Sequence, residues 1–200
     1  MIKEYFADYY LHRSDVTFDF TNNNEMIVHN NVAEPWKVTL IDTGIDTMTG
    51  GRIKRIEKYI GDEPFMLTYG DGVSDVNVRK LMDFHNKNKK TVTITAIQPG
   101  GRFGVLDIGR DNEIKSFTEK SKEDGGWING GFMVLEPDIF NYIHGDKTYF
   151  EREPLENLAK KGQLSAYKHK GFWQCMDTQR DKNLLEELWK NNMAKWKVWD

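Results

Sequence analysis

The residues best suited to chemistry are two acidic side chains, each of which follows a short strand-like segment. Asp71 comes after the apolar run 64–69 (PFMLTY) and Gly70, and Asp177 comes after the aromatic run 171–176 (GFWQCM). Strands that end in this way deliver side chains to the edge of an open α/β sheet where ligands bind. Carboxylate oxygens are the ligands that Mg²⁺ prefers, and this ion usually keeps phosphate in its shell. The pair therefore predicts one metal ion held over a phosphate.

Each of these acidic residues also has a plainer interpretation. Gly70 and Gly72 flank Asp71 and fit a tight turn, in which aspartate and glycine only suit the backbone. Asp177 precedes a helix expected over 182–191, and a lone aspartate in that place often caps the helix. The metal-site hypothesis depends on the two residues acting together.

Two further segments combine glycine with polar side chains. The segment 44–55 (GIDTMTGGRIKR) has glycines before a helix start, which predicts an anion site; the alternative is a charged surface helix. The second segment has Glu119-Lys120 followed by 127–131 (WINGG). Its polar side chains suit sugar hydroxyls, and Trp127 suits a sugar or base face. The alternative is a glycine-containing bend with a surface ion pair.

Composition excludes several classes of protein. The formal net charge of −3 comes from mixed signs, so no basic face for nucleic acid is expected. No apolar run approaches the roughly 20 residues of a membrane helix. The single cysteine, Cys175, excludes an internal disulfide, which fits a cytoplasmic location. The five histidines lack paired metal-binding spacing, so we interpret them as structural or exposed, and Cys175 as a packing residue.

The positioning elements alternate between helix and strand before hairpins enter. Apolar spacing predicts an amphipathic helix at 2–11, and further helices at 52–60 (capped by Thr49), 78–84, 138–143, 154–161 and 182–191. Strands are expected at 16–20, 25–29, 37–42, 64–69 (buried in a parallel sheet), 91–97, 103–108, 113–117, 132–135 and 165–168. The 200 residues fit one domain, a mixed α/β sheet with a β-rich insertion around 103–117.

Taken together, these segments resemble the glucose-1-phosphate cytidylyltransferases, a branch of the sugar-phosphate nucleotidylyltransferase family. The matching stretches keep the family order and span nearly the whole chain. They favour the cytidylyl branch over thymidylyl, uridylyl and guanylyl relatives. These stretches are EPWKVTLIDTG (34–44), MTGGRIKRI (48–56), FMLTYGDGVSD (65–75), GRFGVLDI (101–108), INGGFMVL (128–135) and GFWQCMDTQRDK (171–182).

The resemblance implies a Rossmann-like, GT-A-like nucleotidyltransferase domain over residues 1–200. It implies that CTP and α-D-glucose 1-phosphate give CDP-glucose and pyrophosphate with Mg²⁺, in O-antigen and lipopolysaccharide precursor synthesis, by a homo-oligomer. Carried over position by position, the catalytic metal ligands are Asp71 and Asp177. The nucleotide-binding residues are Thr47, Arg52 and Gly70, and the sugar-phosphate-binding residues are Glu119, Lys120 and Asn129.

The sequence departs from the family pattern in two places. The family opens with a strand and a glycine-rich loop, GGxGTR followed by a PKP lysine, and neither occurs here. We therefore expect an N-terminally truncated fold whose activity alone is weak or absent. Ser121 stands where many relatives have proline, which affects the sugar loop.

Two other functions remain open from the sequence. One is a metal-dependent glycosyltransferase, although Asp71 and Asp75 lie too far apart for a tight Asp-x-Asp clamp. The other is a non-catalytic partial subunit that binds sugar phosphate or assembles with intact copies.

Overall fold

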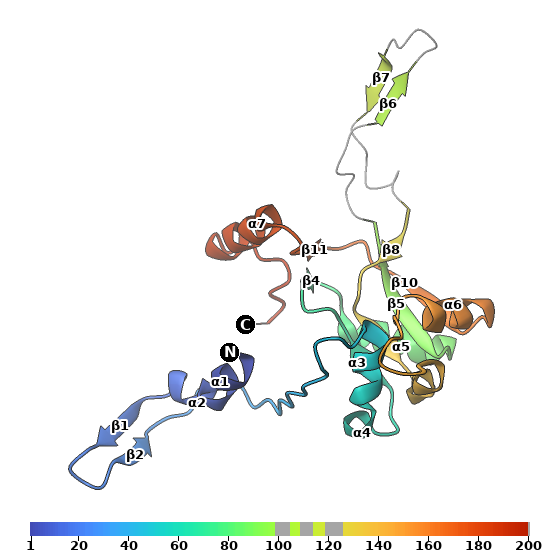
Figure 1. Cartoon of the computed structure of the whole chain (residues 1–200). Helices are drawn as coiled ribbons and strands as arrows, with labels where there is room; N and C mark the ends of the chain where they lie inside the picture. Colours follow the sequence, from blue (N-terminus) through green and yellow to red (C-terminus); the bar gives the residue numbers. More distant parts are fainter. Residues whose placement is uncertain (99–104, 109–113, 119–125, 200) are drawn as a thin grey trace. The chain divides into compact units, whose positions relative to one another are not determined.

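The computed structural model describes residues 1–98, 105–108, 114–118 and 126–199 (Figure 1). The chain divides into two compact units, residues 1–42 and residues 43–200. Each is described by itself, and the single domain stays a prediction. Among the described residues, no helix combines the length and apolar composition needed to cross a bilayer.

The first unit consists of two short helices and a hairpin. Helix α1 (Ile2–Ala7) and helix α2 (Tyr9–His12) are separated at Asp8, so the predicted helix over 2–11 is interrupted. Strands β1 (Val16–Asp19) and β2 (Glu25–Val28) pair antiparallel, as expected. The predicted strand over 37–42 is wrong, because that segment forms no ladder with any described strand.

The second unit is built on a mixed sheet. Its main strands are β3 (Phe65–Leu67), β5 (Val92–Ile97), β9 (Met133–Leu135) and β10 (Leu164–Lys168), in the order β10-β5-β9-β3, and β8 (Ile128–Asn129) also pairs with β5. Strands β5 and β10 run parallel, whereas β9 runs antiparallel to both β5 and β3. The mixed sheet is confirmed, but the prediction that 64–69 lies in a parallel sheet is wrong.

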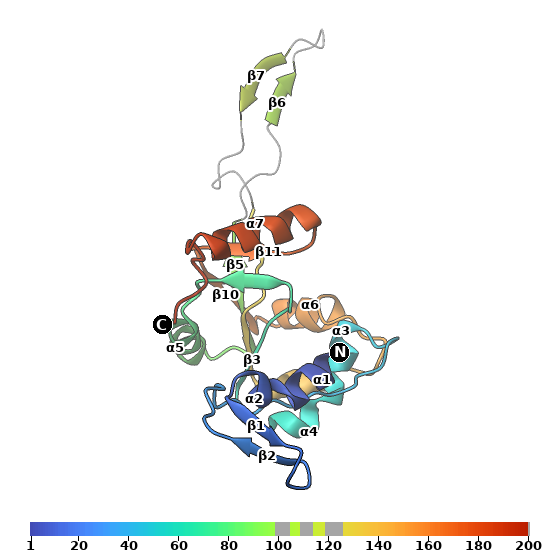
Figure 2. The same cartoon turned by 90° about the vertical axis from the view of Figure 1, so that its left-hand side faces the viewer.

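Helices cover both faces of this sheet. Strand β5 alternates its side chains: Val92 joins the main hydrophobic core, and Thr93 bonds His85 of helix α5 (Val78–Asn88) on the other face. Helix α6 (Glu153–Lys160) supplies Leu155 and Leu158 to the core face. Figure 2 shows α5 and α6 on opposite sides of the sheet.

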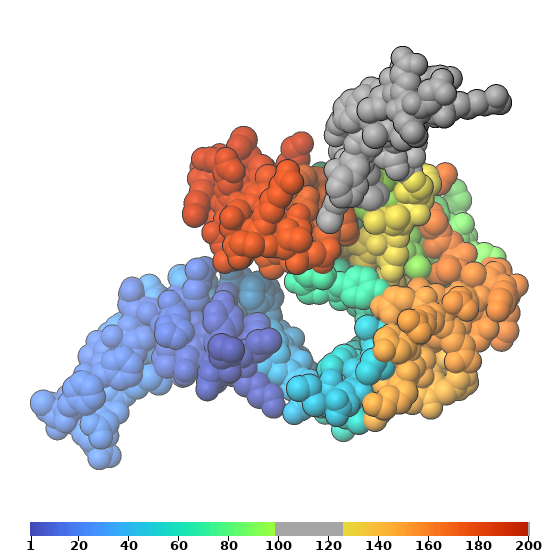
Figure 3. All heavy atoms as spheres, turned by 45° about the horizontal axis from the view of Figure 1, so that its top comes forward, coloured from blue at the N-terminus to red at the C-terminus, as the bar shows by residue number. Residues whose placement is uncertain are grey.

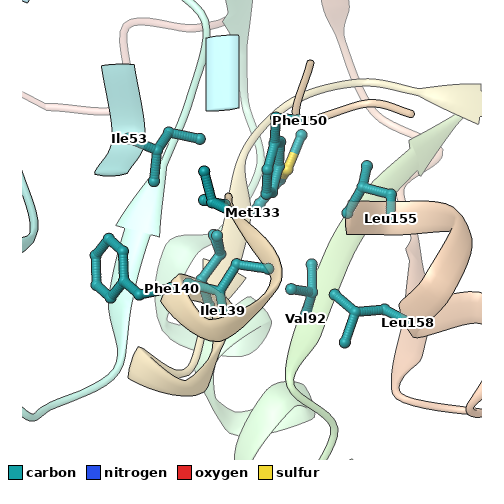
Figure 4. Packing of buried hydrophobic residues seen from close by; sticks show 10 residues of the cluster. Ile53, Val92, Met133, Ile139, Phe140, Phe150, Leu155 and Leu158 are labelled. Carbon is teal, nitrogen blue, oxygen red and sulfur yellow. The ribbon is translucent and has the colours of Figure 1, made fainter. Parts of the chain in front are cut away.

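The main core joins the sheet to the helices of one face (Figure 4). Helix α3 (Thr49–Arg55) contributes Ile53, and the 3₁₀-helix η1 (Pro137–Tyr142) contributes Ile139 and Phe140. Burying each such side chain contributes about 1.5–3 kcal/mol. Helix α4 (Glu57–Ile60) follows α3 after a break at Ile56, so the predicted helix over 52–60 is divided, and Thr49 is its first residue rather than its cap.

Two small ribbons complete the second unit. Strands β6 (Val105–Ile108) and β7 (Ile114–Thr118) form an antiparallel hairpin, which confirms the β-rich insertion. Strands β4 (Gly72–Ser74) and β11 (Trp173–Cys175) pair antiparallel, and helix α7 (Gln179–Lys190) follows β11. After α7, Trp196 stacks on Phe172, with ring centroids 5.4 Å apart, so the C-terminal segment packs against the turn before β11.

Candidate functional site

The pairing of β4 with β11 brings the two predicted metal-binding segments together. Cys175 lies opposite Gly72, and the Met176 amide donates to the Asp71 carbonyl at 2.8 Å, which extends the ladder by one residue. Asp71 therefore faces Met176, the residue before Asp177, and both aspartates are exposed. In Figure 3 the surface of β11 and α7 adjoins that of β4. Their role as metal ligands stays a prediction.

The plainer interpretation of Asp177, as the cap of the last helix, is wrong. Thr178 caps helix α7: its hydroxyl accepts from the Asp181 amide at 3.2 Å, and the Asp181 carboxylate accepts from the Thr178 amide at 3.0 Å. This is a capping box, in which two otherwise unpaired amides are satisfied reciprocally. Asp177 receives a hydrogen bond from the Cys175 thiol at 3.2 Å.

The packing of the chain does not require glycine at position 70. A Cβ atom built on Gly70 would meet nothing within 4 Å, and the residue has no left-handed φ. The fold itself therefore accepts a side chain at this position. The open space beside Asp71 is available to a ligand.

Asp75 holds the turn that precedes β11. Its Oδ1 accepts from the Phe172 amide at 2.7 Å and lies 2.9 Å from His169 Nε2. A Cβ on Gly171 would lie 2.3 Å from the same oxygen, so this close approach requires glycine. Ser74 Oγ also approaches His169 Nε2, at 3.3 Å. Because Ser74 and Asp75 share one ring nitrogen, the three residues cannot act as a Ser-His-Asp relay.

The start of helix α3 is closed by the chain's own backbone. The Gly50 and Gly51 amides donate to the Thr148 carbonyl at 2.9 and 3.3 Å. A Cβ on Gly51 would lie 2.6 Å from the Asp146 backbone. These glycines allow the loop 145–150 to approach closely, and their two amides are not free for an anion. An anion site in the segment 44–55 therefore stays a prediction, and it would have to use side chains rather than these two amides.

Arg52 is arranged differently from Arg55. Its guanidinium donates to the Thr43 hydroxyl at 2.6 Å and to the Ile45 carbonyl at 3.2 Å, and it forms no salt bridge within the part of the chain described. Arg55 instead binds both carboxylate oxygens of Asp146, at 2.9 and 2.6 Å, and this holds the pKa of Asp146 below its usual range. Among the described residues, the Arg52 guanidinium therefore donates to uncharged groups.

Thr47, the other predicted nucleotide contact in this segment, lies just before the same helix. It is only 5% exposed. Access to its side chain from solvent is therefore narrow. Its role toward a nucleotide stays a prediction.

Asn129 begins a turn that contacts both predicted metal-binding segments. Its Oδ1 accepts from the Gly131 amide at 2.9 Å, and its amide nitrogen lies 3.4 Å from the Tyr69 hydroxyl. The Trp173 indole donates to the Gly130 carbonyl at 2.7 Å, which ties the turn to β11. Gly131 has φ +72°, a left-handed conformation that favours glycine. This geometry sets Asn129 beside the segment that carries Asp71.

The rest of the predicted sugar side is only partly described. Glu119 and Lys120 lie outside the described residues. The Trp127 ring, expected against a sugar or base face, lies 5.2 Å from the Lys168 ammonium. That contact is a cation–π pair on a partly exposed ring.

A hydrogen-bonded group that the sequence did not predict joins these segments. The Tyr69 hydroxyl donates to Glu151 Oε1 at 2.8 Å, and the Thr49 hydroxyl donates to Glu151 Oε2 at 2.7 Å. Burial is the main cause that raises the pKa of the Tyr69 hydroxyl, and the bond to Glu151 raises it further. No motif marks Glu151 in the sequence, so only the three-dimensional contact reveals it.

Asp71 and Asp177 suit Mg²⁺ by chemistry. Within residues 1–98, 105–108, 114–118 and 126–199, no three His, Cys, Asp or Glu side chains form a group that would enclose a metal. Mg²⁺ does not require such a cage, since it is usually held by one or two carboxylates together with phosphates and water. Two exposed carboxylates at adjoining strand ends fit that pattern.

Comparison with known proteins places this geometry in a family. Residues 20–190 match the family described as Nucleotidyl transferase. Glucose-1-phosphate cytidylyltransferase of Salmonella typhimurium (strain LT2) is 53% identical over 100% of this chain, which spans 77% of that protein. The chain belongs to the glucose-1-phosphate cytidylyltransferases.

Two further relatives agree with this family of nucleotidyl transferases. The Bacillus subtilis (strain 168) protein described as "Probable glucose-1-phosphate cytidylyltransferase" is 44% identical over 99% of the chain, which spans 77% of it. The crystal structure of HddC from Yersinia pseudotuberculosis matches 72% of the chain, with a TM-score of 0.54 and 27% identity. The chain spans 63% of HddC. The mixed α/β nucleotidyltransferase fold is confirmed.

Proposed function

We propose that this cytidylyltransferase chain forms CDP-glucose and pyrophosphate from CTP and α-D-glucose 1-phosphate, with Mg²⁺ held by Asp71 and Asp177. The observation that carries the proposal is the register of β4 and β11, which puts Asp71 opposite the residue before Asp177. The family membership supports the reaction, and the exposure of both carboxylates supports their availability to a cation.

The remaining assignments come from the family resemblance, and the described geometry supports some of them. Thr47, Arg52 and Gly70 would lie against the nucleotide, because Arg52 has no acidic partner within the described chain and the space beside Gly70 is open. Asn129, with Glu119 and Lys120, would contact the sugar phosphate. A homo-oligomer, a cytoplasmic location and a role in O-antigen precursor synthesis belong to the same proposal.

The reaction needs alignment and charge neutralisation more than covalent chemistry. A phosphate oxygen of glucose 1-phosphate forms a bond to the α-phosphorus of CTP, the bond from that phosphorus to the β-phosphate oxygen breaks, and pyrophosphate leaves. Bound Mg²⁺ would neutralise charge on the phosphates. Arg52 would attract the anionic substrate, and Asn129 would orient the sugar phosphate.

The test is CDP-glucose formation and binding by the purified chain with MgCl₂. We expect Mg²⁺-dependent binding of CTP and CDP-glucose and turnover by the chain alone that is weak or absent. For Asp71→Asn and Asp177→Asn we expect weaker nucleotide binding and a further loss of about a hundredfold or more in any turnover. Pyrophosphate release and chromatography of CDP-glucose measure turnover, and titration calorimetry measures binding. Asp83→Asn, an exposed residue of α5, is the matched control and keeps both properties.

Three results separate the alternatives. Failure of the wild-type chain to bind either nucleotide with Mg²⁺ would falsify the proposal. Binding of sugar phosphate without turnover would point to a non-catalytic subunit. The glycosyltransferase alternative has no support in the geometry, because Asp75 is engaged with Phe172 and His169.

A further inference from the structure

Glu151 connects two segments that lie far apart in the sequence. One carboxylate oxygen accepts from Tyr69 at the end of β3, and the other accepts from Thr49 at the start of α3. The Thr49 hydroxyl in turn accepts from the Phe150 amide at 2.9 Å. Each oxygen of the carboxylate therefore fixes a different element, and hydrogen bonds to a charged acceptor are the stronger kind.

Tyr69 extends this connection to both predicted substrate sides. It directly precedes Gly70 and Asp71. Its hydroxyl lies 3.4 Å from the Asn129 amide nitrogen. Its ring packs on Gly131, where a Cβ atom would lie 3.2 Å from Tyr69 Cδ2. A shift of Tyr69 would therefore move the neighbourhoods of Asp71 and Asn129 together.

Glu151 does not need Tyr69 and Thr49 as partners to compensate for burial. Glu151 is exposed, so water would satisfy its carboxylate if the two hydroxyls were absent. What the two direct hydrogen bonds add is a fixed geometry between the start of α3, the end of β3 and the Asn129 turn. Geometry of this kind matters in an active site, where a misplacement of about 1 Å reduces the rate on the order of a hundredfold.

We propose that Glu151 and Tyr69 are positioning residues that hold Asp71 and Asn129 in a set arrangement relative to helix α3. Nucleotide and sugar phosphate are thereby aligned with each other. The inference deepens the proposed function and rests on it for the identity of the ligands. In this proposal Glu151 and Tyr69 do not touch the substrate. They act through Asp71, Asn129 and Thr49.

The first test measures the affinity of CDP-glucose with MgCl₂ by titration calorimetry. We expect Glu151→Gln and Tyr69→Phe each to weaken binding about tenfold, because the first removes one acceptor oxygen of the group and the second removes the hydroxyl that bonds both Glu151 and Asn129. The double variant is expected to bind about as weakly as the weaker single variant, since the two residues share one interaction. Additive effects of the two substitutions would overturn the proposal.

Matched controls separate positioning from general damage. Glu153→Gln and Tyr59→Phe change exposed residues of the same types outside the group, and we expect affinity within twofold of the wild type. Thr49→Ser keeps the hydroxyl and is expected to bind like the wild type, whereas Thr49→Val removes it and is expected to bind about tenfold more weakly. Equal affinity of the Ser and Val variants would also contradict the proposal.

A second measurement needs no ligand. In ¹H–¹⁵N spectra of the free chain, Glu151→Gln is expected to shift the Asp71 and Asn129 amide signals, and Glu153→Gln is expected to leave them unchanged. If the wild type fails to bind CDP-glucose, the proposed function fails, and these spectra alone decide the positioning role. If the wild type binds but both signals stay in place, only the positioning role is overturned.

Discussion

At the scale of single residues, the glycines of this chain have different reasons to be glycine. Gly51 lies where the Asp146 backbone leaves no room for a Cβ atom, and a Cβ atom on Gly171 would displace the side chains of Asp75 and His169. Gly70 has open space around it, so nothing inside the chain requires it. A glycine that folding does not require is a reasonable place for a ligand to approach the backbone.

Alanine substitutions test this distinction. Gly51→Ala places a methyl group 2.6 Å from backbone atoms of Asp146, which cannot rotate away, and we expect the free energy of unfolding to fall by about 2 kcal/mol. Gly70→Ala is expected to change it by no more than about 0.5 kcal/mol but to weaken CTP binding. Urea unfolding and titration calorimetry measure the two effects. Equal destabilisation by both substitutions would contradict the distinction.

Sequence patterns indicated some residues of the candidate site and not others, for one physical reason. Asp71 and Asp177 follow strand-like segments, and this local pattern is readable without a structure. Glu151 bonds Tyr69 across 82 residues and Thr49 across 102, and no local pattern encodes such contacts. The engagement of the Gly50 and Gly51 amides was equally hidden from the sequence, because the carbonyl that accepts from them belongs to distant Thr148.

At the scale of elements, the N-terminus of helix α7 shows which residue caps the helix and which does not. Thr178 and Asp181 form the capping box, and this leaves Asp177 outside the helix. The helix is 12 residues long and contributes Leu185 to the buried residues. Its first turn is therefore stabilised by Thr178, and Asp177 is available at the end of β11.

Substitutions at the two positions should separate stability from binding. Thr178→Ala removes the cap and is expected to cost about 1 kcal/mol, which corresponds to a melting temperature lower by about 2–4 °C. Asp177→Ala is expected to leave the melting temperature within about 1 °C and to abolish Mg²⁺-dependent nucleotide binding. Thermal denaturation followed by circular dichroism gives the first value. A larger thermal effect at Asp177 than at Thr178 would restore the capping role.

Elements with strong local signals were predicted, whereas the pairing of strands that lie far apart in the sequence was not. Periodic apolar residues and polar turns identified α5, α7, the β1–β2 hairpin and the β6–β7 insertion. The segment 37–42 has strand-like residues but finds no partner strand among those described, and β3 pairs antiparallel with β9. Strand pairing depends on neighbours that are distant in the chain, so residue preference alone does not fix it.

At the scale of the whole molecule, the two units differ in how much they bury. None of residues 1–42, all of which are described, is buried, and Phe18 and Phe20 remain 55% and 79% exposed. In residues 43–200 the strands β5 and β9 include side chains with no exposure, such as Val92 and Val134. Segments with little buried apolar surface open more easily than core strands.

Hydrogen exchange followed by mass spectrometry tests this difference. Amides of β1 and β2 are expected to exchange at least about a hundredfold faster than those of β5 and β9, because opening the hairpin disrupts no buried core. The measurement is made at low protein concentration. Equal protection of the two regions would show that the hairpin is covered in solution, for example by a second copy of the chain.

Because the first amides of helix α3 are already hydrogen-bonded, the affinity for nucleotide should depend on ionic strength. Since the Thr148 carbonyl occupies the Gly50 and Gly51 amides, an anion arriving along the helix axis meets an oxygen rather than a pair of hydrogen-bond donors. Attraction at this end then depends on cationic side chains such as Arg52, which is exposed and therefore open to counterions. Added salt should therefore compete with nucleotide here more strongly than it would with a phosphate enclosed by main-chain amides.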